Sequence, residues 1–138
     1  MKKFIGRKSI LATPMLRGAY NDYRGWVLPT DENGSDEGYL VEYVDGGDSN
    51  HSDHKGYISW SPGSVFNNAY RPSETHIERM LIERDELQAN CDKLHTFFQS
   101  DIFDAMKPAE KRDLLIKQLS KMVDYLSILK YRINLETK

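Results

Sequence analysis

A heptad pattern of apolar residues between Thr75 and Phe98 constrains the fold more than any other feature. The apolar positions of this stretch are Ile77, Met80, Leu87, Cys91, Leu94 and Phe98. Their spacing is that of the a and d positions of a helix that packs lengthwise against another helix. Arg84 occupies the a position between Ile77 and Cys91. Because burying an unpaired guanidinium is costly, Arg84 must find a carboxylate, a backbone acceptor or a ligand.

A second apolar stripe lies near the end of the chain and has the same spacing. It comprises Leu115, Leu119, Met122, Leu126, Leu129 and Ile133. Two long helices with matching stripes predict an antiparallel hairpin. Thr75 and Glu78 form the sequence signature of a capping box, Pro108 suits the first turn of the last helix, and residues 100–106 predict a short connecting helix.

Further apolar residues of the two long helices exceed what one partner helix can cover. They are Leu81, Ile82, Leu114, Val123 and Ile128. An apolar surface of this kind predicts packing on the N-terminal part of the chain or on other copies of it.

The first half of the chain predicts short strands and short helices instead. We expect a strand over residues 3–13 with Phe4, Ile5, Ile10 and Leu11 as candidates for burial, and a short helix over residues 15–23. Residues 38–45 and 56–60 predict a hairpin with a long polar tip. A helix over residues 63–70 follows, with Ser61 as its cap and Pro62 in its first turn. The expected fold class is therefore α+β, with a small hairpin-containing unit at residues 1–71 and a helical hairpin at residues 73–138.

Composition narrows the classes of partner. The 138-residue chain has a formal net charge of −2, which argues against broad binding to duplex nucleic acid. Its one cysteine, Cys91, forbids an intramolecular disulfide and suits a reducing cytosol. No apolar run is long enough for a signal peptide or a membrane span, so we expect no membrane partner.

Two loops carry possible metal ligands, and neither predicts a metal site. Residues 31–42 place oxygen-bearing side chains at calcium-loop spacing, but Asp36 stands where the loop needs glycine. The tip of the predicted hairpin holds Asp48, His51, Asp53 and His54 in a polar stretch without a fixed framework. No catalytic motif is present, so the residues predict a binding protein with no enzymatic activity, no cofactor and no catalytic residue.

The helical part resembles a known family. The run from Ile77 to Ile133, which includes IERMLIERDEL, KLHTFF and YRI, is similar to small helical proteins of tailed phages. That family includes the sponges that sequester cyclic oligonucleotides made by bacterial CBASS immunity. The N-terminal part, with GYLVEY and GYISWSP, resembles a second phage module of uncharacterised activity.

The resemblance implies compact homo-oligomers that bind cyclic dinucleotides between protomers and larger cyclic trinucleotides at a separate site near a three-fold axis. It points to six candidate ligand-binding residues, which are Arg84, Gln99, Ser100, Asp101, Pro108 and Arg132. Arg84 stands where the family has an aromatic residue, so stacking on a base would come from its guanidinium plane. Asp101 would have to accept a hydrogen bond from a base edge, whereas Arg132 suits a phosphate.

Structural roles for the same residues remain open alternatives. Arg84 could pair with Glu83, Glu86 or an acidic residue of the opposite helix. Arg132 could be a solvated cation favoured by the helix dipole. Tyr125 and Tyr131 could be packing residues of an interface.

Two functional hypotheses follow. The first is a phage counter-defence protein that acts in the host cytoplasm and sequesters cyclic di- or trinucleotides without cleaving them. The alternative is an oligomeric phage adaptor that binds a host protein through its aromatic N-terminal unit.

Overall fold

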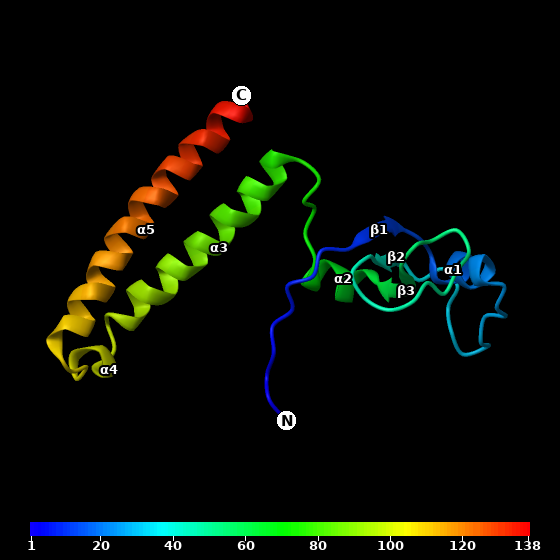
Figure 1. The fold of residues 1–138 in the computed structure, drawn as a ribbon, viewed down its shortest axis with the longest axis horizontal. Coiled ribbons are helices and arrows are strands. Elements are labelled where there is room, and N and C mark those ends of the chain that lie inside the picture. The colour runs from blue at the N-terminus through cyan, green and yellow to red at the C-terminus, as the bar shows by residue number, and fades with distance from the viewer. The chain divides into compact units, whose positions relative to one another are not determined.

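The computed structural model describes residues 1–138, which divide into two compact units, Met1–Tyr70 and Arg71–Lys138 (Figure 1). The first unit contains a three-stranded antiparallel sheet and the second contains helices only. The predicted α+β class is confirmed.

The N-terminal unit is built on strands β1 (Leu11–Pro14), β2 (Gly38–Tyr43) and β3 (Tyr57–Pro62). The strands are ordered β1-β2-β3, so β2 is central, and its Leu40 lies between Thr13 of β1 and Trp60 of β3. Helix α1 (Arg17–Arg24) follows β1, and helix α2 (Gly63–Ala69) follows β3. The predicted hairpin of two strands with a long connection is thus present as β2 and β3.

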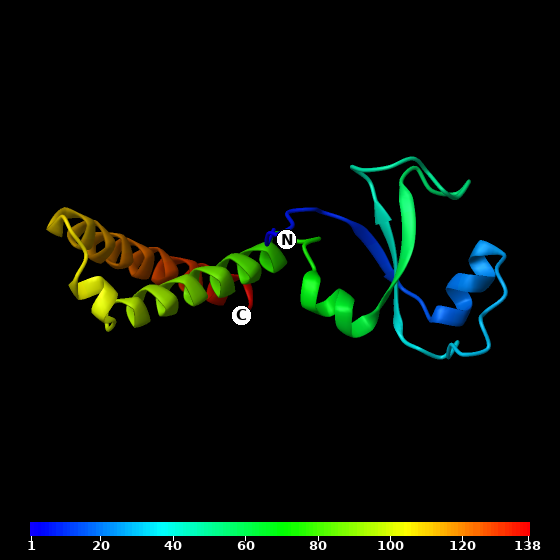
Figure 2. The same ribbon diagram turned by 90° about the horizontal axis from the view of Figure 1, so that it is seen from below.

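The two short helices pack on opposite faces of the sheet, as Figure 2 shows. Because strand side chains alternate between faces, Leu40 and Ile58 share one face while Tyr39 points to the other. Tyr20 of α1 packs with Leu40 and Ile58 in the core of the unit. On the other face, Phe66 of α2 stacks on Tyr39 with ring centroids 3.8 Å apart.

Two details of this unit differ from the sequence prediction. The predicted strand over residues 3–13 is wrong in extent, since only Leu11–Pro14 pairs with β2, and Phe4 and Ile5 are 87% and 85% exposed. Only four residues of β1 pair with β2, from Leu11 opposite Glu42 to Pro14 opposite Tyr39, so the segment before Leu11 has no partner strand. Ser61 is not the cap of α2 either, because Pro62 holds that position without a side-chain hydrogen bond.

The second unit is a helical hairpin. Helix α3 (His76–Phe97) and helix α5 (Ala109–Glu136) run side by side, and helix α4 (Asp101–Asp104) links them at one end (Figures 1 and 2). The capping box at the start of α3 is confirmed, because the Thr75 side chain accepts from the backbone of Glu78 and the Glu78 side chain accepts from the backbone of Thr75. α4 is shorter than the predicted residues 100–106.

The two predicted stripes form the seam between α3 and α5. Met80, Leu129 and Ile133 make its buried cluster, and Leu129 has no exposed surface. Cys91 is also buried in the seam and is a free thiol. Outside the seam, Leu114, Val123 and Ile128 are exposed, in agreement with the expected surplus of apolar surface. No helix combines the length and the apolar character that a membrane span requires.

Candidate ligand-binding site

Arg84 lies on α3, half-buried, and pairs with a carboxylate that the sequence prediction did not consider. Its Nε donates to Oδ1 of the neighbouring Asp85 at 2.9 Å, and its Nη2 forms an ion pair with the same oxygen at 2.9 Å. Arg71 donates from Nη1 to the other oxygen of Asp85 at 2.7 Å. Hydrogen bonds from Arg84 and then Arg71 hold the pKa of Asp85 below its ordinary value. Of the three kinds of partner that the sequence left open for Arg84, the structure shows a carboxylate, that of Asp85, and shows no pairing with Glu83, Glu86 or the opposite helix.

Three side-chain contacts between α3 and α5 relate positions on one helix to positions on the other. Tyr125 donates a hydrogen bond to Glu83, Lys130 donates to Gln88 at 2.8 Å, and His76 lies 3.6 Å from Glu136. From His76 to Glu83 on α3 the contacted residue of α5 falls from Glu136 to Tyr125, as expected for antiparallel packing. The contact between Lys130 and Gln88 joins residues that are offset along the hairpin axis, which both long side chains can span. By interpolation, Arg132 is level with residues near position 80 of α3, so Arg84 and Arg132 are about one helical turn, or about 6 Å, apart along the axis.

Arg132 is exposed on α5 and takes part in no ion pair. Tyr125, Ile128 and Leu135 are exposed large side chains, and their spacing to Arg132 places all four on one flank of the helix. The guanidinium is therefore a free cation framed by apolar and aromatic surface, which suits an anion with a planar apolar part.

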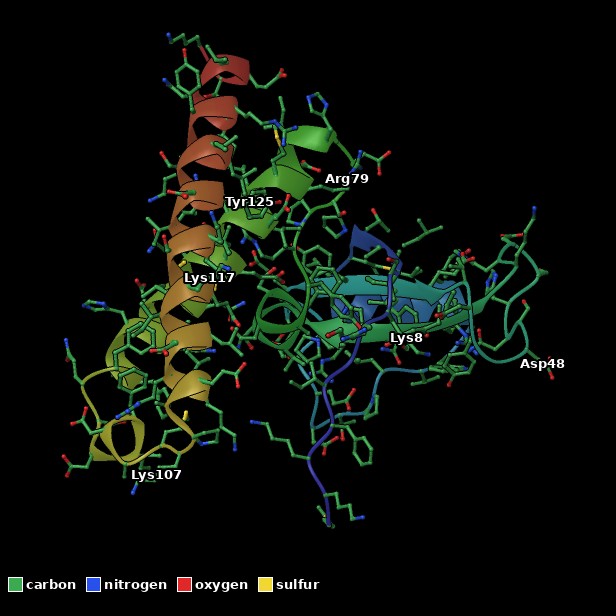
Figure 3. The ribbon with its side chains drawn as sticks, turned by 60° about the vertical axis from the view of Figure 1, so that its left-hand side comes forward. Lys8, Asp48, Arg79, Lys107, Lys117 and Tyr125 are labelled. Atoms are coloured by element: carbon green, nitrogen blue, oxygen red, sulfur yellow. The ribbon has the colours of Figure 1, made fainter.

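The other four predicted residues gather at the opposite end of the hairpin. Ser100 caps α4, since its hydroxyl accepts from the backbone of Phe103 at 3.2 Å and donates to the carbonyl of Phe97 at 2.6 Å. Gln99 and Asp101 flank it and are exposed, and Pro108 precedes the first residue of α5. Figure 3 shows this end of the hairpin at Lys107, with Tyr125 farther along α5.

Arg112 also lies at the α4 end of the hairpin, and the sequence did not identify it as a candidate residue. Its Nη1 donates to the carbonyl of Asp104 at 2.9 Å and ties the start of α5 to the end of α4. An i to i+8 contact across a link has no signature in heptad spacing, so no sequence signal could have singled it out. The hydroxyl of Ser100 is occupied by two backbone partners, so the side chains of Gln99 and Asp101 are the ones free to contact a ligand here.

A single chain therefore carries two separate groups of predicted site residues. Pro108 and Arg132 are roughly 24 residues apart on one helix, which corresponds to roughly 36 Å. Arg84 and Arg132 lie at similar levels of the hairpin on different helices, and Gln99, Ser100, Asp101 and Pro108 lie around its α4 end, so one protomer cannot present both groups to one small ligand.

Two side chains of the helical unit with potential catalytic chemistry, His76 and Cys91, are engaged or covered. His76 contacts Glu136 and Cys91 is covered, so neither is placed beside a partner that would activate a nucleophile. In the whole structure no group of three or more His, Cys, Asp or Glu side chains converges to hold a metal ion. Of the possible ligands at the β2–β3 tip, His54 is engaged by Glu42 and Tyr23.

Comparison with known proteins adds one finding on the helical unit. No curated protein and no solved structure showed a significant match to the chain. Residues 74–135, which span α3, α4 and nearly all of α5, match the model of the family described as Sequestin, so the helical hairpin of this chain is similar to that family.

Proposed function

We propose that this protein is a phage counter-defence protein that sequesters cyclic oligonucleotide signals of bacterial immunity in the host cytoplasm and releases them intact. The observation that supports the proposal most is the match of residues 74–135 to the Sequestin family, whose name denotes sequestration.

The geometry of the hairpin favours a ligand held between copies. Arg132 supplies an unpaired guanidinium for a phosphate, and Tyr125, about two turns away on the same flank of α5, supplies an aromatic face for a base. The second group, at Gln99, Ser100, Asp101 and Pro108, offers polar side chains for base edges. Because one chain holds these groups roughly 36 Å apart, a site that uses both needs a second chain packed antiparallel, with its α4 end near Arg132 of the first.

The exposed flank of α5 supports such an assembly. Leu114, Ile128 and Leu135 recur at heptad spacing outside the seam and expose large apolar side chains. A surface helix with a second apolar stripe buries it against another helix when one is available. Arg132 lies within this stripe, so packing of copies would place the guanidinium at the interface.

The proposal is tested by isothermal titration of the full chain with a panel of cyclic di- and trinucleotides. We expect saturable binding of at least one member, and Arg132→Gln should weaken that binding by about tenfold or more through the loss of a charge-assisted contact. Lys93→Gln is the matched control, because it removes one exposed positive charge from the helical unit without touching either group of site residues. The absence of heat for every member of the panel would sink the proposal.

A second measurement separates sequestration from cleavage. Ligand released by denaturing the complex should elute intact by chromatography, whereas hydrolysed products would show an enzyme. The adaptor hypothesis makes the opposite prediction for the panel, namely no binding of any cyclic nucleotide together with stoichiometric capture of one host protein.

A further inference from the structure

The N-terminal unit contains a pocket of about 770 Å³ that is unrelated to the helical site. Its wall is formed by α1, the segment after α1 and the strand β3, all within Met1–Tyr70. A volume of this size falls in the range of small-molecule sites, which is about 300–1,000 Å³. The pocket is lined by both tryptophans of the chain, Trp26 and Trp60, and by two arginines, Arg17 and Arg24.

Trp60 forms a fixed part of the wall. Its Nε1 donates to the carbonyl of Met15 at 2.8 Å, which sets the orientation of the indole ring. The Arg17 guanidinium lies over this ring, 4.5 Å from its centroid. Arg17 is itself held by Glu32 at 3.4 Å and by Asp36 at 3.1 Å, so its charge is balanced within the protein.

Arg24 is placed differently, because no carboxylate balances its charge. Its guanidinium lies 4.4 Å from the centroid of Trp26 and donates from Nη1 to the hydroxyl of Tyr20 at 3.0 Å. Arg24 takes part in no ion pair. The Trp26 ring is half exposed, with Tyr20 edge-on at 6.1 Å between centroids. The pocket therefore presents aromatic surface beside one unbalanced positive charge.

We infer that this pocket binds a planar aromatic ligand with a single anionic group, with the ring against the indole of Trp26 and the anion on Arg24. Stacking on an aromatic side chain accepts any flat ring, and an unpaired guanidinium selects a phosphate or carboxylate. One free cation suits one anionic group, whereas Glu32 in the wall repels a second. A mononucleotide and an aromatic carboxylate share this chemistry.

The experiment uses the fluorescence of the full chain, because both of its tryptophans line the pocket and none lies in the helical unit. Excitation at the red edge of indole absorption avoids absorption by nucleobases. The probes are the four nucleoside monophosphates, adenosine, inorganic phosphate and nicotinate. We expect saturable quenching by a monophosphate or by the carboxylate, which also identifies the source of the anion, and a response at least about tenfold weaker for adenosine and for phosphate alone.

Substitutions of Arg24 test whether the fluorescence quenching comes from binding in the pocket. Arg24→Gln should weaken binding of the responding probe by about tenfold, and Arg24→Lys should restore only part of it because a lysine lacks the planar fork. Arg7→Gln is the matched control, since Arg7 is exposed in the same unit and lies outside the pocket. Thermal unfolding shows that each variant is folded. Linear, non-saturating quenching by every probe up to about 1 mM, or equal affinity in Arg24→Gln, would overturn the inference whatever the outcome for cyclic nucleotides.

Discussion

Tyr23 and His54 lie 31 residues apart in the sequence, and the Tyr23 hydroxyl and His54 Nε2 are 2.8 Å apart. The other ring nitrogen of His54 contacts Glu42 of β2, and Glu42 also accepts a hydrogen bond from the backbone of Gly56 at 3.2 Å. His51 stacks on the Tyr23 ring with centroids 4.3 Å apart. These contacts of His51 and His54 hold the β2–β3 connection against α1.

The Glu42 contact predicts how the stability of the N-terminal unit responds to acid. The hydrogen bond from His54 holds the pKa of Glu42 below its ordinary value of 4.5, against the opposing effect of desolvation. A carboxyl whose pKa is lowered on folding stabilises the fold above its unfolded pKa and loses that contribution as the pH falls through the folded value. We expect Glu42→Gln to lower the urea midpoint at about pH 6 and to have a shrinking effect below about pH 4.5. A difference between the two proteins that stays constant down to acid pH would contradict this role.

A substitution at Gly38 should damage the sheet because there is no room for a side chain. A Cβ atom on Gly38 would lie 2.3 Å from the carbonyl oxygen of Ser61 and 2.4 Å from the ring of Trp60. Gly38→Ala must therefore displace both the neighbouring strand and the indole, and we expect a loss of about 2 kcal/mol in the free energy of unfolding. Gly6→Ala serves as the control, because nothing lies within 4 Å of the added atom. Chemical denaturation monitored by tryptophan fluorescence measures both.

Truncation of Leu129 tests the seam of the helical unit. This side chain is fully buried between Met80 and Ile133, so Leu129→Ala leaves a cavity that the helices cannot close. The expected loss is about 3 kcal/mol in the free energy of unfolding, measured by circular dichroism at the helix band. Ile116→Ala, on the exposed side of the same helix, should change the free energy of unfolding by less than about 0.5 kcal/mol. Equal effects of the two substitutions would mean that α3 and α5 do not pack as described.

Asp85 pairs with Arg84, one of the proposed ligand-binding residues. Because Asp85 accepts hydrogen bonds from both Arg84 and Arg71, an anion must compete with a carboxylate for either guanidinium. Asp85→Asn removes the competing charge, so we expect tighter binding of an anionic ligand at this level of the hairpin, by about threefold to tenfold in titration. The Arg84→Gln, Asp85→Asn double variant should lose the gain if Arg84 carries it. Weaker binding in Asp85→Asn would show instead that Asp85 holds Arg84 in the binding position.

The helical unit was largely predictable because local signals and periodicity agree. The capping box of Thr75 and Glu78 predicts the start of α3. The heptad spacing of residues such as Met80 and Leu129 predicts which faces of α3 and α5 pack together. The first strand was not predictable, because Phe4 and Ile5 have strand propensity but β2 ends before it can pair with them. Strand length depends on the partner, and the sequence of one strand does not contain that information.

The candidate site was predictable only in part, for a similar reason. The family resemblance identified six candidate ligand-binding residues, but it did not show that they lie at two ends of one hairpin. The pairing of Arg84 with Asp85 was missed because adjacent helical residues point in different directions, so an i to i+1 ion pair is not expected from spacing. The pocket between α1 and β3 combines residues of several segments and has no local signature.

The buried thiol of Cys91 can be used to measure how often the helical hairpin opens. A thiol reagent cannot reach the sulfur while α3 and α5 are packed, so modification requires the two helices to separate first. Since the chain has no other cysteine, any thiol modification occurs at Cys91, and no engineered label is needed. When separation and reclosure are fast compared with labelling, the modification rate measures the small fraction of hairpins that stand open at any moment.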